Sequence, residues 1–195
     1  MNKKTVLQKT VLAGLFTALS LVLIALIRIP IIPAAPWLVL DGGDIPALLA
    51  GFLLGPWWGL AVNVASSLIQ GFAFSSDGIV GAAMHILSTG LFVVLSGALY
   101  RRFHTFRGAL LGLLVGAVSF IAVILPVNVL ITPAFYGMPT QAVVDLILPA
   151  LLPFNAIKAG VNIALVLLLY KPISRAVKSF GWMEKDVDKN RPDRV

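Results

Sequence analysis

Long apolar stretches, separated by short polar or proline- and glycine-rich segments, run through most of this chain. Uninterrupted apolar runs predict helices over residues 6–29, 57–74, 79–100 and 108–131, and a last helix that begins after Asp145 and ends before Lys171. A shorter apolar segment covers residues 45–54. A helix needs about 20 apolar residues to cross the hydrocarbon core of a bilayer. The pattern therefore predicts an all-α membrane protein.

Two connecting segments carry signals against helix. The stretch "IPIIPAAPWLVLDGGD" (29–44) is rich in proline, which lacks the backbone N–H that an inner helical turn requires. We expect it to form an extended loop. The stretch "TPAFYGMPT" (132–140) holds two prolines and a glycine, and we expect it to break the chain between the fifth and sixth helices. The first apolar run, Val11 to Ile27, is long and is followed by further spans, so we interpret it as a retained helix and not a signal peptide.

Composition and charge agree with a membrane protein. Of the 195 residues, 59% are hydrophobic and 12% are charged, and the mean hydropathy is +0.98. The chain has no cysteine, which excludes disulfides and thiolate metal sites. A net charge of +7 could indicate nucleic-acid binding, but the basic residues cluster at helix ends, as expected for cytoplasmic anchors. These clusters are Lys3, Lys4 and Lys9; Arg101, Arg102 and Arg107; and Lys171, Arg175 and Lys178.

The positions of the charges predict the topology. If the segment 45–54 counts as a crossing, six transmembrane helices place both termini and all three basic clusters in the cytoplasm. Asp41, Asp44, Asp77 and Asp145 then fall in or beside the opposite loops. We expect residues 1–178 to form one transmembrane substrate-binding domain. The segment 179–195 mixes both charge signs without apolar periodicity and is expected to be a disordered cytoplasmic tail.

One charged residue lies inside the last predicted helix. Lys158 is flanked by Asn155 and Asn162 at i, i+3 and i+7 spacing, which places the three on one helical stripe. An ammonium in mid-membrane costs roughly 2.5–3.5 kcal/mol and usually faces a partner inside the bundle. Lys158 could pair with a buried acid or extend to the interface, yet no acid falls inside the interior of a long predicted helix. We therefore expect the stripe to face a carbonyl-rich ligand, although interhelical bonding is the better interpretation for Asn162 alone.

Other polar residues in the predicted spans carry weaker signals. Asn63, Ser66, Ser67 and Gln70 belong to the third helix, His85 to the fourth and Asn128 to the fifth. A single histidine is more often a packing residue than a metal ligand, and His104 lies in a cytoplasmic loop, so we expect no metal site. Asn128 follows Pro126 and fits either a ligand site or a helix bend.

Two sets of small residues permit close helix contact. Gly14 and Ala18 form one seam, and Gly108, Gly112 and Gly116 form another, which we expect to serve internal packing. An exposed seam would instead serve as a docking face for another membrane subunit. The chain has no G-x-x-x-x-G-K-[ST] loop for ATP and no H-E-x-x-H or G-x-S-x-G motif. We therefore expect no catalytic residues and no ATP hydrolysis by this chain.

Four stretches over about residues 8–175 resemble one family. They are "LDGGDIPALLAGFLLGPWWGL" (40–60), "SSDGIVGAAMHILSTGLFV" (75–93), "PVNVLITPAFYG" (126–137) and "LPFNAIKAGVN" (152–162). They are similar to the S components of energy-coupling factor (ECF) vitamin transporters, in particular the riboflavin-specific branch. The resemblance implies a multi-pass cell-membrane protein that binds the vitamin near the extracellular face under the first loop. It also implies docking on an ECF T subunit with two cytosolic ATPases.

The resemblance also implies site residues. The P-F-N-x-I-K segment would place Asn155 and Lys158 at the polar edge of the isoalloxazine ring, with help from Asn128, His85, Ser67 and Asn162, and with Phe74 stacking on the ring. Riboflavin is then a transported ligand, and no cofactor is expected.

The chain departs from the pattern of the branch in three places. His85 replaces an asparagine, Ser66 and Ser67 replace a Lys-Asn pair, and Gly14 and Ala18 replace an Ala-x-x-x-Ala docking motif. Two alternative functions stay open. The chain could be an S component for another vitamin or flat heterocycle, because such a ligand fits the same polar stripe. It could instead belong to a different class of protein, either a membrane enzyme with Lys158 as its base or a scaffold subunit.

Overall fold

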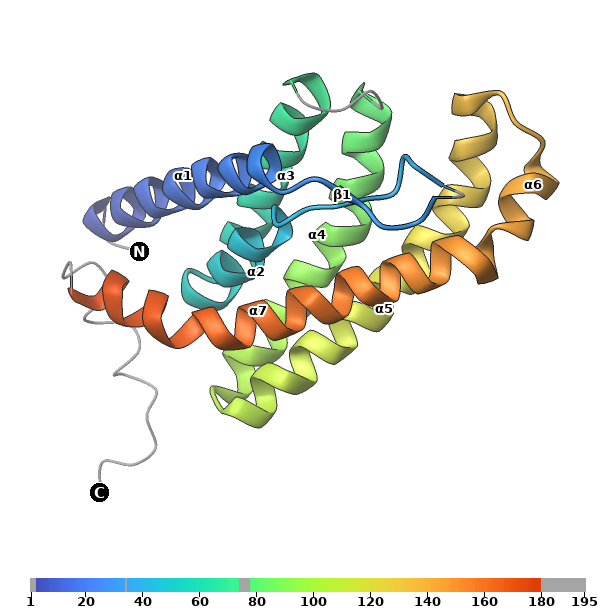
Figure 1. Cartoon of the computed structure of the whole chain (residues 1–195). Helices are drawn as coiled ribbons and strands as arrows, with labels where there is room; N and C mark the ends of the chain where they lie inside the picture. Colours follow the sequence, from blue (N-terminus) through green and yellow to red (C-terminus); the bar gives the residue numbers. More distant parts are fainter. Residues whose placement is uncertain (1–2, 34, 74–77, 180–195) are drawn as a thin grey trace.

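Helices make up nearly all of the described part of the chain. The computed structural model describes residues 3–33, 35–73 and 78–179. The α-helices are α1 (Lys3–Leu26), α2 (Asp44–Leu53), α3 (Pro56–Ala73), α4 (Gly78–Phe103), α5 (Phe106–Tyr136), α6 (Thr140–Asp145) and α7 (Leu152–Ser179) (Figure 1). One π-helical segment, η1 (Ile147–Leu151), leads into α7. Within these residues, the helices long and apolar enough to cross a membrane cover Lys3–Leu26, Gly78–Phe103, Phe106–Tyr136 and Ile147–Val177. The prediction of an all-α membrane protein is confirmed.

The short helix α2 forms the centre of the bundle. All ten of its residues are buried, and it packs against α1, α3, α4 and α7 (Figure 1). Ten helical residues rise about 15 Å, which is half the thickness of the hydrocarbon core. The predicted helix at residues 45–54 is therefore present, enclosed by longer helices. That it counts as a crossing of its own stays a prediction.

Glycines allow the central helices to meet at backbone distance. A Cβ added to Gly59 in α3 would lie 2.6 Å from the Cα of Gly51 in α2, and one added to Gly97 in α4 would lie 2.9 Å from the Gly51 carbonyl. On α5, a Cβ at Gly112 would lie 2.8 Å from the Ser96 carbonyl of α4. The α5 seam therefore serves internal packing, as predicted.

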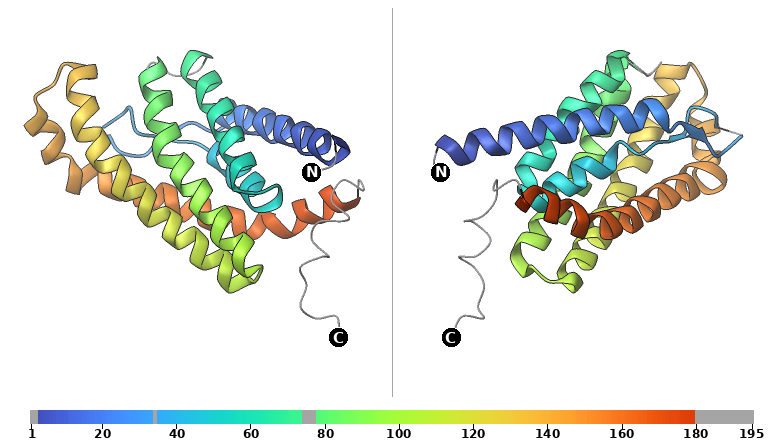
Figure 2. Two further views of the ribbon diagram at one scale, coloured as in Figure 1. Left: turned by 180° about the vertical axis from the view of Figure 1, so that it is seen from behind. Right: turned by 60° about the vertical axis from the view of Figure 1, so that its left-hand side comes forward.

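The proline-rich segment is extended, as its sequence predicts. Its two ends pair as a short antiparallel sheet, in which β1 (Ile29–Pro30) lies beside β2 (Val39–Leu40). The segment between the strands folds over the bundle toward α6, away from the first turn of α1 and the last turn of α7 (Figure 2). The start of α1 and the end of α7 therefore lie at the opposite end of the bundle from this loop.

Two predicted helix ends are wrong. Helix α5 continues through Pro126 and Pro133 to Tyr136, so residues 132–136 of the expected break are helical, and α7 continues through Pro172 to Ser179. A proline within a helix removes one hydrogen bond, and this alone does not end either helix. Helix α5 ends at Gly137, whose φ of 66° is left-handed and whose N–H donates to the Pro133 carbonyl.

Candidate functional site

A cavity of about 320 Å³ lies between α3, α4, α5, α7 and the α1–α2 loop. Its size is at the lower end of the range for small-molecule sites, and both polar and aromatic side chains line it. Five of the predicted site residues lie in its wall: Ser67, His85, Asn128, Asn155 and Lys158. Phe74 lies outside the described residues. Side chains from four helices and one loop, distant in sequence, thus meet at one site.

Asn155 and Lys158 reach the cavity from the first turns of α7. The π-helical segment η1 immediately precedes them, and such segments often occur at functional sites because they re-aim the following side chains. Asn155 Nδ2 donates to the Leu151 carbonyl at 2.7 Å. This bond fixes the amide, and its Oδ1 is the acceptor that the side chain can present to a ligand.

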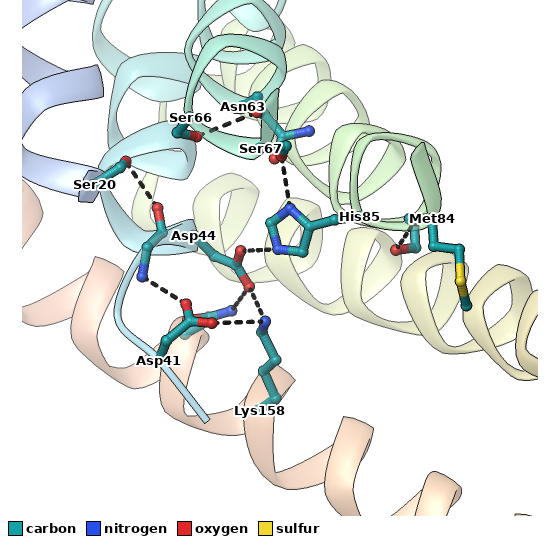
Figure 3. Close-up of polar contacts among 12 residues, drawn as sticks. Ser20, Asp41, Asp44, Asn63, Ser66, Ser67, Met84, His85 and Lys158 are labelled. Atoms are coloured by element: carbon teal, nitrogen blue, oxygen red, sulfur yellow. Dashed lines mark hydrogen bonds and ion pairs between the residues drawn. The ribbon is translucent and has the colours of Figure 1, made fainter. Parts of the chain in front are cut away.

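Lys158 is paired with acids in this structure, contrary to the expectation of an unpaired stripe. Its Nζ lies 3.3 Å from Asp44 Oδ2 and 3.9 Å from Asp41 Oδ2 (Figure 3). The side chains of Lys158 and Asp41 are each 8% exposed and that of Asp44 is 1% exposed. The expectation failed because Asp44 is the first residue of α2, which the longer helices enclose. Asp44, which the sequence placed in or beside a loop, is therefore buried inside the bundle.

Asp44 connects three helices to α2. His85 Nε2 of α4 lies 2.8 Å from Asp44 Oδ1, and Ser67 Oγ of α3 lies 2.8 Å from His85 Nδ1 (Figure 3). Asn162 Nδ2 of α7 donates to Asp44 Oδ2 at 2.9 Å. Asn162 is 2% exposed and is not part of the cavity wall. This hydrogen bond supports the interhelical role for Asn162, and its contact with a ligand stays a prediction.

Asp41 ties the loop to its own turn and to α1. Its Oδ1 accepts a hydrogen bond from the Gly43 N–H at 2.9 Å, and the Gly43 carbonyl accepts one from Ser20 Oγ at 2.8 Å (Figure 3). A Cβ at Gly43 would lie 2.6 Å from Ile24 Cγ1, so glycine permits this close approach of the loop to α1. The loop end that faces the cavity is thus held from both α1 and α7.

Asn128 lines the cavity, but its amide is occupied within α5. Its Nδ2 donates to the Ile124 carbonyl at 2.9 Å, and its Oδ1 accepts from Thr132 Oγ1 at 3.1 Å. The first bond spans Pro126, and the second lies in the turn that follows it. Asn128 therefore lies in the cavity wall, and its roles in ligand binding and in a helix bend both stay predictions.

Aromatic side chains supply the flat walls of the cavity. They are Trp37, Phe120, Phe135, Tyr136 and Phe154. The rings of Trp37 and Tyr136 lie 5.4 Å apart with a 33° tilt. Trp37 Nε1 is buried and has no hydrogen-bond partner among the described residues, so it can donate to a bound ligand. Trp37 belongs to the α1–α2 loop, and the folding of this loop brings its ring beside Tyr136 of α5.

The seam of small residues on α1 is accessible. Gly14 and Ala18 are exposed on α1, and a Cβ added to Gly14 would have no neighbour within 4 Å. Exposed apolar residues continue along the same helix: Leu7, Val11, Leu15, Leu19, Val22 and Leu26. Within the described residues, no group of three His, Cys, Asp or Glu is placed to hold a metal ion.

The fold and the cavity define a multi-pass membrane protein with a cavity lined by polar and aromatic side chains among its helices. Comparison with known families identifies it further. The family model of the substrate-specific component of ECF transporters matches residues 8–170, and the chain belongs to this family.

Individual relatives agree with this assignment. The riboflavin transporter RibU of Staphylococcus aureus (strain TCH60) is 27% identical over 88% of this chain and 93% of its own length. The riboflavin transporter FmnP of Bacillus subtilis (strain 168) is 29% identical over 91% of this chain and 95% of its own length. A solved structure of the S component of a bacterial ECF transporter matches with a TM-score of 0.74 and 28% identity, over 87% of this chain and 97% of that one. The chain is therefore a membrane transport component and not an enzyme.

Proposed function

We propose that this chain binds riboflavin in the cavity between α3, α4, α5 and α7 and acts in its uptake as the S component of an ECF transporter. The observation that carries the proposal is the meeting of Asn155 and Lys158 with aromatic walls in one cavity. Two relatives that match nearly the whole chain are named riboflavin transporters, which supports the same ligand.

The side chains match the chemistry of the vitamin. The isoalloxazine ring is flat and has carbonyl oxygens and a ring N–H at one edge. Lys158 and Trp37 Nε1 can donate to the carbonyls, and Asn155 Oδ1 can accept from the N–H. Aromatic side chains such as Trp37 and Tyr136 can cover the faces of the ring. Ser67, His85 and Asn128 then line the remaining wall.

The proposal extends to topology and partners. Six crossings with cytoplasmic termini agree with the basic clusters and with the common end at which α1 begins and α7 ends (Figure 2). As a family member, the chain would work with an ECF T subunit and two cytosolic ATPases. The exposed Gly14 and Ala18 on α1 are the proposed contact with the T subunit, because small residues allow close helix approach in a membrane.

Spectroscopy of the purified protein tests the ligand. We expect protein from cells supplied with riboflavin to be yellow, and ligand-stripped protein to quench flavin fluorescence with one-to-one saturation. Asn155→Leu should weaken binding by about tenfold or more, since the ring N–H loses its acceptor. The matched control Gln141→Leu removes an exposed amide on α6, outside the cavity wall, and should bind normally. A colourless protein that leaves flavin fluorescence unchanged would contradict the proposal and direct the search to other flat vitamins.

Uptake measurements test the docking face separately. Gly14→Leu adds a side chain where the structure has open space, so riboflavin binding and thermal stability should remain unchanged. Uptake of labelled riboflavin by cells and co-purification of the T subunit should both fall strongly. Normal uptake by this variant would show that docking uses another face.

A further inference from the structure

The short turn between α4 and α5 lies at a surface of the membrane. Both helices are long and apolar enough to cross a bilayer, so the chain must leave the hydrocarbon core between Phe103 and Phe106. Figure 1 shows this turn at the lower end of the two helices, away from the α1–α2 loop. None of the residues from Arg101 to Arg107 lines the cavity. The turn therefore takes no part in the site described above.

Three arginines surround the turn. Arg101 and Arg102 lie in the last turn of α4, and Arg107 lies in the first turn of α5. All three are exposed, and none forms an ion pair within the residues that the structure describes. A guanidinium is permanently charged in proteins and fits two oxygen atoms of a phosphate at once. The turn therefore presents three groups that are suited to a phosphate.

Helix α7 adds positive charge beside the turn. The hydroxyls of Tyr100 in α4 and Tyr170 in α7 bond to each other, which holds these parts of the two helices together. Lys171 and Arg175 follow on α7 and are exposed. Among the described residues from 45 to 179, the only acid is Asp145, which ends α6 at the other end of the bundle (Figure 1). The described side chains around the turn therefore carry positive charge without an acid among them.

Two exposed aromatic rings lie among the arginines. Phe103 is 48% exposed and Phe106 is 66% exposed. Exposed apolar side chains beside several bases are typical of a segment in the membrane interface, where the rings lie below the headgroups and the charges lie among the phosphates. A soluble anion would leave both rings in water. The combination of rings and arginines therefore favours an anionic lipid over a soluble anion.

Hydrogen bonds of its own hold the turn in one conformation. The His104 N–H donates to the Tyr100 carbonyl at 2.8 Å, and His104 has a left-handed backbone, with φ of 47°, where α4 ends. Thr105 Oγ1 accepts from the Gly108 N–H at 3.0 Å and caps the start of α5. A preordered backbone lowers the entropic cost of binding. The turn can therefore bind a headgroup without first becoming ordered.

We propose that the α4–α5 turn, residues 101–107, is a binding surface for the headgroups of anionic lipids. Its three arginines contact the lipid phosphate, its two phenylalanine rings lie against the acyl chains, and Lys171 and Arg175 strengthen the positive potential. This surface is separate from the proposed riboflavin site. It agrees with the proposed topology, in which the turn faces the cytoplasm, because anionic lipids give the cytoplasmic leaflet its negative charge.

Native mass spectrometry of the full chain tests the proposal. The protein is released from micelles that contain equal amounts of dioleoylphosphatidylglycerol, which is anionic, and dioleoylphosphatidylcholine, which has no net charge. We expect the unmodified protein to retain mainly the anionic lipid. Arg102→Gln/Arg107→Gln should lower the ratio of anionic to neutral lipid by about tenfold or more, since each base near an anionic surface contributes about fivefold. An equal ratio in the unmodified protein, or an unchanged ratio in this variant, would overturn the proposal.

Two further variants separate a local site from total charge. Arg102→Lys/Arg107→Lys keeps both charges and should keep most of the preference. Lys3→Gln/Lys4→Gln removes the same charge at the start of α1, which both figures of the whole chain show apart from the turn (Figures 1 and 2). This control should bind both lipids as the unmodified protein does. A loss of preference as large as that of the arginine variant would show that net charge selects the lipid, and would overturn the proposal.

The aromatic contact and the source of the phosphate need their own measurements. Phe106→Ser leaves every charge in place and should lower the amount of anionic lipid retained, whereas excess inorganic phosphate should not displace it. Unchanged retention, or displacement by phosphate, would contradict a lipid site. Riboflavin titration of the same proteins reports the other site separately. If riboflavin binds to none of them, the proposed function fails, and the lipid ratios still decide the role of the turn.

Discussion

Side chains link α4 and α7 at two places, and the two links use different chemistry. At the cavity end, His85 and Lys158 do not touch each other but share the carboxylate of Asp44. At the other end, the hydroxyls of Tyr100 and Tyr170 bond directly to each other. The Phe52 ring of α2 stacks on Tyr100 with centroids 4.6 Å apart. One end is joined by exchangeable charges and the other by neutral aromatic packing.

The difference assigns separate roles to the two ends. An ion pair can exchange one partner for another with small movements of side chains, so the cavity end can adapt to a ligand. The backbone contacts of Gly51 with Gly59 and Gly97 leave no room for side-chain adjustment at the centre of the bundle. We expect the aromatic end and the glycine crossing to stay fixed while the charged end rearranges.

Removal of the Lys158 charge should have the largest effect. Lys158→Met leaves Asp44 and Asp41 without their ammonium partner. Breaking a buried pair in this way costs about 3–5 kcal/mol. Thermal unfolding in detergent, monitored by circular dichroism, should show a marked loss of stability together with a loss of riboflavin binding.

The double variant Lys158→Met/Asp44→Asn separates folding from binding. It removes the uncompensated carboxylate of Asp44 and should recover most of the lost stability without recovering affinity. Asn162 can still donate to the new amide at this position. Equal stability of the single and double variants would show that the ion pair does not support the cavity end.

The glycine crossing should give the next largest effect. Gly59→Val forces a side chain onto the backbone of Gly51, with the first added carbon 2.6 Å from its Cα. Overpacking of this kind costs roughly 1–3 kcal/mol, and backbone neighbours cannot move aside. A lower unfolding temperature and a lower yield of monodisperse protein should follow.

Gly14→Val is the matched control for the crossing. Both glycines are helical, but no atom lies within 4 Å of a Cβ at Gly14. Its unfolding temperature should equal that of the unmodified protein. If both variants lost the same stability, the low helix propensity of valine would explain the loss, and packing against Gly51 would not.

The tyrosine pair should give the smallest of the three effects. Tyr100→Phe removes one hydroxyl from the contact with Tyr170 and leaves the ring stacked on Phe52. The loss of one such hydrogen bond costs about 1 kcal/mol. The unfolding temperature should fall slightly, while riboflavin affinity stays unchanged. A change in affinity would show that the two ends are coupled.

Local sequence patterns predicted the elements and the turn of α7 that faces the cavity. Apolar runs located the helices, prolines marked the extended segment 29–44, and the i, i+3 spacing joined Asn155 to Lys158. These features depend on residues close together in the chain. Proline failed as a stop signal at Pro133 and Pro172, because a helix end also needs a residue such as Gly137 that can close the last turn.

The partners of Lys158 could not be found in the same way. Asp44 is buried only because four longer helices surround α2, and no local pattern records that enclosure. Trp37 likewise meets Tyr136 only after the loop has folded over the bundle. The contacts that sequence reasoning missed are those between segments far apart in the chain.

The enclosure of α2 has a consequence for how the protein is made. A segment of ten residues that begins with an aspartate is too short and too polar at its start to remain in a bilayer by itself. Asp44 leaves the ribosome early, whereas Asn162, which binds it, follows 118 residues later, and Lys158 lies on the same late helix. Until α7 is synthesised, the acid lacks these two partners. The insertion of α2 is therefore completed only by the last helix of the chain, and truncation before α7 should leave a product that membrane quality control removes.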